Sequence, residues 1–331
     1  MADNQGKYLY GFVNANEGFS LPSSLAEQKV SALRYGDLAA IVTDAEEIDL
    51  PSLKKEAILR KLAVHQSVIE KVMKERPTLP AKFGTVLESN EETEEFLQKV
   101  YPEVRQALNK MGDKVEIDLV VLWNGRSVIE DILAEDEEVL GMKRELKDEV
   151  LPATAMSTKV ELGKRVYQLL RKKREKYAEE ILKTLKEEAE DSQVNRILPD
   201  EMVLNVAFLI EPHGEKNLDL KIQNLNEKYG ERLNFRCVGP LPPYSFFTLE
   251  VNKISPGDLD RSRQVLGVNA ESLTQLKQHY HQLTLKYHPD SSADANTEGK
   301  FAEIKQAYEL LSNYFNRGRF WCQFLKLNSE V

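Results

Sequence analysis

The sequence predicts an α+β fold, with two α+β domains followed by a small all-α domain. Short runs of β-branched and aromatic residues, bounded by Asn, Gly or Asp, are typical of strands. They alternate with segments whose apolar residues recur every three or four positions, as in helices. Strand patterns stop near residue 255, so we expect domains at residues 1–112, 113–255 and 258–331.

The first domain should begin with two short strands, at residues 7–13 and 38–43. The period then changes, which predicts a helix over residues 51–76 that ends at a proline. The face of this helix is formed by Ile58, Leu62, His65, Ile69 and Val72. A second helix is expected over residues 91–111, ended by a glycine.

The second domain opens with the alternation of apolar and acidic residues at 115–123, which is typical of a half-buried strand. A helix over 126–150 and a long amphipathic helix over 160–190 should follow. The remaining expected elements are strands at 202–210, 233–238 and 244–251 and a helix at 218–229. This mixture favours a ferredoxin-like sheet over a doubly wound parallel sheet.

The tail differs from both domains in pattern and in charge. Ser255-Pro256-Gly257 interrupts the chain, and helices are predicted at 259–266, 272–287 and 297–315. Residues 258–331 hold 9 Lys or Arg and 9 Asp or Glu, so the preceding residues carry the net charge of −9. A last apolar cluster around Phe320 and Trp321 is expected to pack against the helices of the tail.

Composition narrows the class of function. With 45 Lys and Arg against 54 Asp and Glu, nucleic acid and anionic lipid membranes are poor partners. The 2 cysteines match no disulfide framework or metal spacing, and the first residues do not resemble a signal peptide, so we expect a cytoplasmic protein. Phosphate loops, nucleophile elbows and zinc motifs are absent from the sequence, so we expect no enzyme, no cofactor and no metal.

Three sets of polar residues could suggest chemistry, and for each we favour a plainer interpretation. His65, followed by Glu70, could transfer protons, but its place on an apolar helix face favours a packed core histidine. His279 and His281 point apart on a helix, which disfavours a metal pair. The basic run 171–176 favours a solvated helix face because glutamates follow it.

Two connecting segments are more informative, residues 79–86 and 239–246. In the second, three prolines follow Gly239 within four residues, which stiffens the backbone and removes hydrogen-bond donors before the next strand. A rigid turn that sets strand register and a binding segment remain equal alternatives.

Together these segments resemble the GvpL/GvpF family of gas vesicle accessory proteins, over about residues 6–251. The resemblance rests on Tyr8-Leu9-Tyr10-Gly11, His65 with Glu70, Leu79-Pro80 to Gly84-Thr85, Val115-Glu116 and Gly239-Pro240-Leu241-Pro242-Pro243-Tyr244-Ser245-Phe246. It implies two α+β domains and a role in gas vesicle assembly rather than catalysis. It also implies contact with the apolar major shell protein and with other accessory proteins. The expected location is therefore the cytoplasm, in association with gas vesicles. The candidate residues for binding the shell protein are Phe83, Gly84, Pro240, Pro242, Pro243 and Tyr244.

The tail resembles a J-domain. Residues 276–287 match its second helix, His288-Pro289-Asp290 its signature loop, and residues 301–312 its third helix. The resemblance implies that the tail docks on an Hsp70 chaperone and stimulates ATP hydrolysis there. The residues implied in this contact are His288, Pro289, Asp290, Lys277, Tyr280 and Lys286.

One departure from the J-domain pattern concerns charge. Gln278, His281 and Gln282 stand where that helix usually carries Lys or Arg. Fewer basic groups should slow association with an acidic partner and weaken binding, most of all at high salt.

These resemblances favour an assembly factor whose α+β body covers the shell protein until vesicle nucleation and whose J-domain recruits Hsp70. The first alternative is a purely structural minor component of the vesicle wall. The second is an enzyme or a ligand-binding domain built on a ferredoxin-like sheet.

Overall fold

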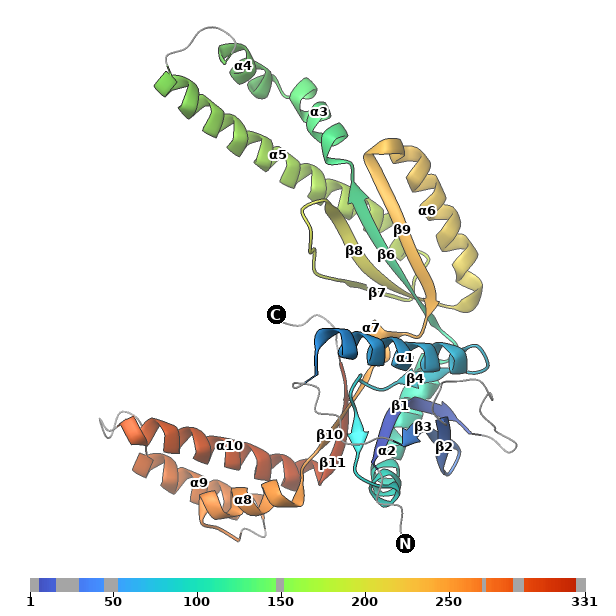
Figure 1. Cartoon of the computed structure of the whole chain (residues 1–331), viewed down its shortest axis with the longest axis vertical. Helices are drawn as coiled ribbons and strands as arrows, with labels where there is room; N and C mark the ends of the chain where they lie inside the picture. The colour runs from blue at the N-terminus through green and yellow to red at the C-terminus, as the bar shows by residue number, and fades with distance from the viewer. Residues whose placement is uncertain are drawn as a thin grey trace. The chain divides into compact units, whose positions relative to one another are not determined.

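The structure is a computed structural model that describes residues 6–15, 30–44, 53–146, 152–269, 272–287 and 295–325. Contacts divide it into two compact units, each with helices and antiparallel strands (Figure 1). Unit 1 consists of Met1–Val72, Ala81–Lys110 and Leu249–Phe324, and unit 2 of Met73–Pro80, Met111–Thr248 and Leu325–Val331. The predicted α+β class is confirmed.

Unit 1 begins with a sheet whose central strand is buried on both faces. Its elements are β1 (Lys7–Asn14), β2 (Val30–Tyr35), β3 (Leu38–Asp44), α1 (Lys55–Met73), β5 (Val86–Leu87) and α2 (Asn90–Met111). The strands lie in the order β2-β3-β1, and β5 also pairs with β1. Phe12 of β1 lies against Phe96 of α2, with ring centroids 6.2 Å apart. The expected strands 7–13 and 38–43 are β1 and β3.

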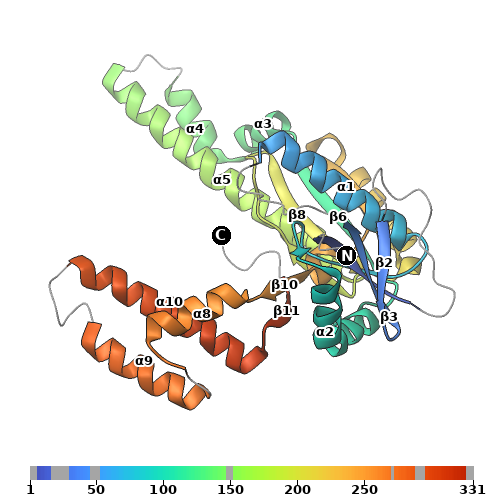
Figure 2. The ribbon, with the colours of Figure 1, turned by 60° about the horizontal axis from the view of Figure 1, so that its bottom comes forward.

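The tail forms a helical module within unit 1. It contains α8 (Pro256–Leu266), α9 (Leu273–Tyr287) and α10 (Ala295–Arg317), and it is bracketed by the strands β10 (Leu249–Lys253) and β11 (Phe320–Phe324). The Ser255 hydroxyl caps α8 by accepting a hydrogen bond from the Asp258 amide at 3.1 Å. Leu276, Ile304, Ala307 and Leu311 belong to the buried core of this module. The helix α10 lies beside both α8 and α9 (Figure 2).

Unit 2 contains the ferredoxin-like sheet that the sequence predicts. Its elements are β4 (Thr78–Pro80), β6 (Val115–Trp123), α3 (Gly125–Glu135), α4 (Glu137–Glu145), α5 (Pro152–Lys186), β7 (Asp191–Val194), β8 (Met202–Ile210), α6 (Glu215–Tyr229), β9 (Leu233–Leu241) and α7 (Tyr244–Phe247), with 3-10 turns at Pro212–Gly214 and Gly230–Arg232. The antiparallel strands have the order β7-β8-β6-β9, which with crossover helices gives the β-α-β-β-α-β arrangement.

The core of unit 2 lies between this sheet and the helices α5 and α6 (Figure 1). Alternate residues of β6, including Ile117, Leu119 and Val121, are buried there with Ile181 of α5 and Leu218 of α6. The period of two that predicted this strand therefore reports a single apolar face.

The expected helix over 126–150 is wrong as one element. The described part consists of two helices, α3 and α4, which meet at Asp136. The Asp136 carboxylate accepts a hydrogen bond from the Val139 amide at 3.0 Å and so caps α4. An N-cap in extended conformation cannot continue a helix, and this residue therefore breaks the predicted one.

The expected strand over 244–251 is also wrong in its first half. Tyr244–Phe247 forms the short helix α7, and the strand β10 starts only at Leu249. The Phe247 amide donates to the Pro243 carbonyl at 2.9 Å. Proline directly before a helical turn is favourable because its missing amide needs no partner there.

None of the described helices combines the length and apolar character needed to cross a membrane. Within the same residues, no group of three or more His, Cys, Asp or Glu side chains is placed to hold a metal ion.

Candidate functional site

Phe83 and Gly84 of the first connecting segment, residues 79–86, lie around His65 of α1 together with two tyrosines of β1. His65 is 3% exposed, and its Nδ1 shares a hydrogen bond of 2.8 Å with the Tyr8 hydroxyl. The Tyr10 ring stacks on the imidazole at 5.6 Å, and the Phe83 ring meets it edge-on at 5.7 Å. The Gly84 amide donates to the Tyr8 hydroxyl at 3.3 Å. We call Tyr8, Tyr10, His65, Phe83 and Gly84 the histidine node.

Electrostatics in the histidine node favour neutral side chains. Burial lowers the pKa of His65 from 6.5 to about 4, and burial raises the pKa of Tyr8 above its usual value. A histidine that stays neutral and is enclosed by rings is a packing residue, as the helix-face position favours. Phe83 and Gly84 are partly buried in this node, and their assignment to shell-protein binding stays a prediction.

The second connecting segment, residues 239–246, is tied to the strand β6 through Glu116. Its two carboxylate oxygens accept hydrogen bonds from the Ser245 amide at 2.7 Å and the Ser245 hydroxyl at 2.8 Å. Glu116 is 2% exposed, and burial together with the charge of Asp118 raises its pKa. We call Glu116, Ser245 and Gly239 the glutamate node.

Gly239 belongs to this node because the chain passes β6 too closely for any side chain. A Cβ atom there would lie 2.9 Å from the Glu116 carbonyl oxygen and 2.5 Å from Cδ1 of Ile117. Its φ of +152° is also unfavourable for other residues. This close approach favours the rigid-turn alternative at Gly239.

The other candidate residues of this segment differ in exposure. Pro240 is exposed, Tyr244 is half-buried, and Pro242 and Pro243 are buried. Pro240 is thus the accessible member of the proline set, and the role of all four in binding the shell protein stays a prediction.

In the tail, the structure separates exposed from packed candidates. Lys277 and Lys286 are exposed on α9, and so are Gln278, His281 and Gln282. Tyr280 instead stacks on Tyr308 of α10, with centroids 4.0 Å apart and planes inclined by 16°. Tyr280 therefore joins the two helices, whereas the lysines face solvent. The signature residues His288, Pro289 and Asp290 lie outside the described residues.

Both ends of the tail contact α2, and the sequence did not predict this contact. β10 and β11 pair from Leu249↔Phe324 to Lys253↔Phe320. Arg319 contacts the buried Glu92 of α2 at 3.0 Å, and Lys253 contacts the same carboxylate at 3.5 Å. The Phe320 ring lies 6.0 Å from that of Phe96, so the apolar cluster packs on α2 as well as on the tail, where Trp321 joins the core. We call Glu92, Lys253 and Arg319 the clasp.

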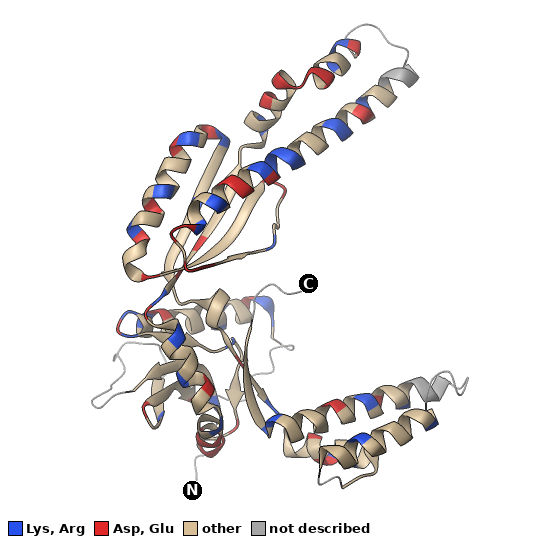
Figure 3. Ribbon diagram, turned by 180° about the vertical axis from the view of Figure 1, so that it is seen from behind, with Lys and Arg blue, Asp and Glu red and all other residues tan. Residues whose placement is uncertain are grey.

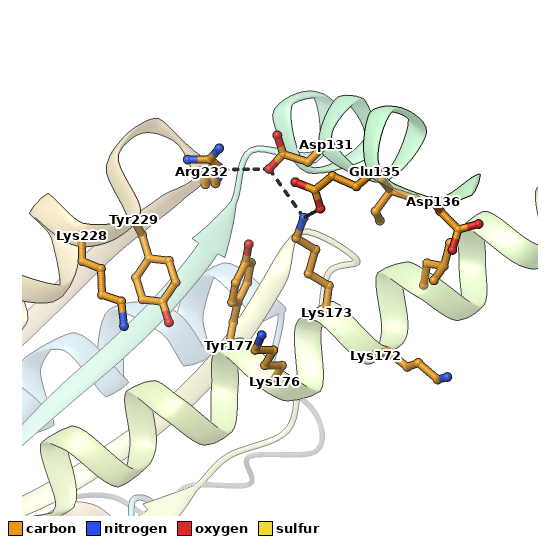
Figure 4. A pocket seen from close by; sticks show the side chains of 12 residues that line it. Asp131, Glu135, Asp136, Lys172, Lys173, Lys176, Tyr177, Lys228, Tyr229 and Arg232 are labelled. Carbon is orange, nitrogen blue, oxygen red and sulfur yellow. Dashed lines mark hydrogen bonds and ion pairs between the residues drawn. The ribbon is translucent and has the colours of Figure 1, made fainter. Parts of the chain in front are cut away.

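A charged cleft of about 590 Å³ lies in unit 2 among α3, α5 and the end of α6 (Figure 4). Lys173 points to Asp131 at 3.5 Å and to Glu135 at 3.7 Å, and Arg232 contacts Asp131 at 2.7 Å. Tyr177 and Tyr229 form its wall, with ring centroids 5.1 Å apart. Because these cations already face carboxylates, the cleft works as an ion-paired junction of three helices.

The basic run 171–176 contributes to this junction, so it is more than a solvated face. Arg171 pairs with Glu175 on the exposed side of α5 at 3.0 Å, while the Arg174 guanidinium lies 5.0 Å from the centroid of the Trp123 ring. Figure 3 shows Lys and Arg interspersed with Asp and Glu along α5. This alternation fits mutual pairing within unit 2.

Comparisons with known proteins identify both parts of the chain. The family described as "Gas vesicle synthesis protein GvpL/GvpF" matches residues 6–248, and the DnaJ domain matches residues 264–320. Gas vesicle protein F of Dolichospermum flosaquae is 22% identical over 247 residues, which cover 73% of this chain and 98% of that protein. DnaJ homolog subfamily B member 9 of Mus musculus is 42% identical over 57 residues, 17% of this chain and 26% of that protein. These relatives are thus a gas vesicle protein and a DnaJ homolog.

Solved structures agree on the fold of the body. The crystal structure of the gas vesicle protein GvpF from Anabaena sp. PCC7120 superposes with a TM-score of 0.62 at 21% identity, covering 73% of this chain and 97% of that one. GvpF from Microcystis aeruginosa gives 0.53 at 19% identity, covering 72% and 98%. The chain therefore belongs to the GvpL/GvpF family of gas vesicle synthesis proteins and carries a DnaJ domain in its C-terminal tail.

Proposed function

We propose that this protein is a cytoplasmic gas vesicle assembly factor. Its body binds the apolar major shell protein before the vesicle wall forms, and its DnaJ domain brings an Hsp70 chaperone to that client. The observation that carries the proposal is the union of a gas vesicle family body and a DnaJ domain in one chain.

The attachment of the tail supports this division of labour. β10 and β11 bracket the helical module, and the clasp holds both of its ends on α2. A client bound to the same chain would meet the recruited chaperone at a high effective concentration. In this mechanism the chain supplies client choice, and the ATPase of the partner supplies the work.

The candidate contacts on the Hsp70 side are His288, Pro289 and Asp290 as the trigger, with the exposed Lys277 and Lys286 as electrostatic support. Only these two lysines are charged among the candidates on α9, so the association should be weak and sensitive to salt. On the client side, the exposed Pro240 is the accessible candidate of the second motif.

The test uses the full chain, because the fragment that ends at residue 257 lacks β11, the partner strand of β10. Purified shell protein is diluted from denaturant, alone and with increasing amounts of this chain, and light scattering is recorded. We expect suppression at near-stoichiometric ratios. Unchanged scattering with a folded chain would contradict the holding role and favour a structural place in the wall.

A matched variant separates the two modules. His288→Gln should suppress scattering as the wild type does, yet it should no longer stimulate ATP hydrolysis by Hsp70. Equal stimulation by both proteins would contradict the proposed partnership with Hsp70.

A further inference from the structure

The two edges of the ferredoxin-like sheet differ in length and in protection. The strand β7 at one edge has four residues, Asp191–Val194. The strand β9 at the other edge has nine residues and, among the residues that the structure describes, pairs only with β6 (Figure 1). Proteins usually protect such an edge by making it short or by placing charged side chains, above all lysine, proline or a bulge on it. Here only one edge is short.

The protection of β9 by proline and an irregular register is confined to its end. Pro240 and a register shift between Glu116 and Asp118 of β6 interrupt the last residues of the strand. Before them, Leu233–Val238 pairs with Trp123–Asp118 in an unbroken register of six residue pairs. This segment contains no lysine and no proline. We call Leu233–Val238 the open edge.

Side chains along the open edge are accessible and only weakly engaged. Val238 is 57% exposed, and Asn234, Arg236 and Cys237 are also exposed. The Arg236 guanidinium donates to the Asn234 side chain at 3.3 Å, and within the described residues it forms no ion pair with a carboxylate. These features suit a binding partner in extended conformation. The unpaired edge would bind its backbone, the exposed valine an apolar side chain, and the unmatched cation a carboxylate.

We infer that the open edge adds a strand of the client protein to the sheet of unit 2, with a client carboxylate placed at Arg236. The inference rests on the proposed function, because that function supplies the client. A second copy of this chain fits less well, since antiparallel pairing of two open edges would bring two Arg236 side chains into the same short stretch and like charges across strands repel. Strand addition would also cover an edge of the client that otherwise promotes aggregation.

The scattering assay tests this inference with two valine variants of the full chain. Val238→Lys places a lysine on the open edge, and Val194→Lys places one on β7, where Val194 is 48% exposed. We expect Val238→Lys to need at least fivefold more protein for half-suppression, and Val194→Lys to stay within twofold of wild type. Equal behaviour of the two variants would overturn the inference while leaving the proposed function intact. Failure of the wild type to suppress scattering would overturn both.

Hydrogen exchange gives a readout that a folding defect cannot imitate. Shell protein added to the wild type should slow exchange of peptides from residues 233–238 at least tenfold, with peptides from β7 unchanged. Suppressed scattering without slower exchange at β9 would overturn the inference.

Charge and self-association complete the test. Arg236→Glu should need at least threefold more protein for half-suppression at low salt, whereas Arg236→Lys should retain the wild-type ratio. Sedimentation of the chain alone tests whether a second copy of this chain occupies the open edge, and we expect a monomer. A wild-type dimer that Val238→Lys dissociates would assign the open edge to self-pairing and overturn the inference.

Discussion

The histidine node of unit 1 and the glutamate node of unit 2 both fix a connecting segment, but they do so with different kinds of contact. Each ties a connecting segment to a strand through a buried titratable side chain. His65 is enclosed by aromatic rings, whereas Glu116 is held by an amide and a hydroxyl that both donate to it. In both nodes, a buried polar side chain thus fixes the path of a connecting segment.

The two nodes also respond to pH in opposite directions. The pKa of His65 is lowered from 6.5 to about 4, so the unfolded chain binds more protons and stability falls as pH falls between these values. The pKa of Glu116 is raised above 4.5, so the folded chain binds more protons and stability falls as pH rises from about 4.5 through the raised pKa. Unit 1 should therefore weaken as pH falls below 6.5, and unit 2 as pH rises above 4.5.

The largest effect should come from filling the space at Gly239. We expect Gly239→Ala to lower the free energy of unfolding by about 3 kcal/mol, because the new methyl meets backbone at 2.9 Å where φ is already unfavourable. Urea unfolding at pH 7 measures it. The control is Gly163→Ala, where a Cβ meets nothing within 4 Å inside α5 and should raise stability by about 0.5–1 kcal/mol. Similar values for both variants would contradict the glutamate node.

The next effect compares two replacements of Glu116. Glu116→Ala leaves the Ser245 amide and hydroxyl without their acceptor and should cost about 2 kcal/mol. Glu116→Gln can accept from the amide and donate to the hydroxyl and does not titrate, so it should stay near wild type at pH 4 and exceed it increasingly as pH rises to 9. Thermal unfolding across this range is the measurement. A glutamine variant that loses stability at pH 9 as steeply as wild type would show that Glu116 does not titrate there.

Much of the fold could be predicted from the sequence, because its signals are local. The alternation at 115–123 and the helical period around His65 both appear as expected, in β6 and α1. The exceptions depend on distant partners. The helical turn Tyr244–Phe247 is held by the Ser245 amide, which donates to Glu116, 129 residues away. The strand β11 forms because β10 lies beside it.

The candidate site was predictable to a smaller extent, for the same reason. The motifs located the segments that matter, but burial decides which of their residues can meet a partner, and it separates Pro240 from Pro242 and Pro243. The clasp and the open edge have no signature in the sequence. Both depend on which strands are neighbours in the folded sheets, β10 with β11 and β9 at the outer edge beside β6.

A smaller effect isolates the titration of His65. Between pH 7 and pH 5.5 its shifted pKa should cost the wild type about 1 kcal/mol of stability, and this loss should vanish in His65→Gln. The amide can still accept from the Tyr8 hydroxyl, which keeps the hydrogen bond of the node. Urea unfolding at both pH values provides the difference. An unchanged slope in the variant would assign the acid sensitivity to other groups.

The smallest effect is expected at the clasp. There the buried carboxylate of Glu92 is held by the partly exposed side chains of Lys253 and Arg319. Arg319→Ala should cost about 1 kcal/mol or less, because Lys253 remains within 3.5 Å of Glu92. The loss should be local, so we expect faster hydrogen exchange in β11 with little change in β6. Arg261→Ala is the matched control, since its pair with Asp258 is exposed on both sides and should contribute nothing measurable. If Arg319→Ala leaves exchange in β11 at the wild-type rate, the strand pairing and Phe320 alone hold the tail, and the clasp adds only charge neutralisation at Glu92.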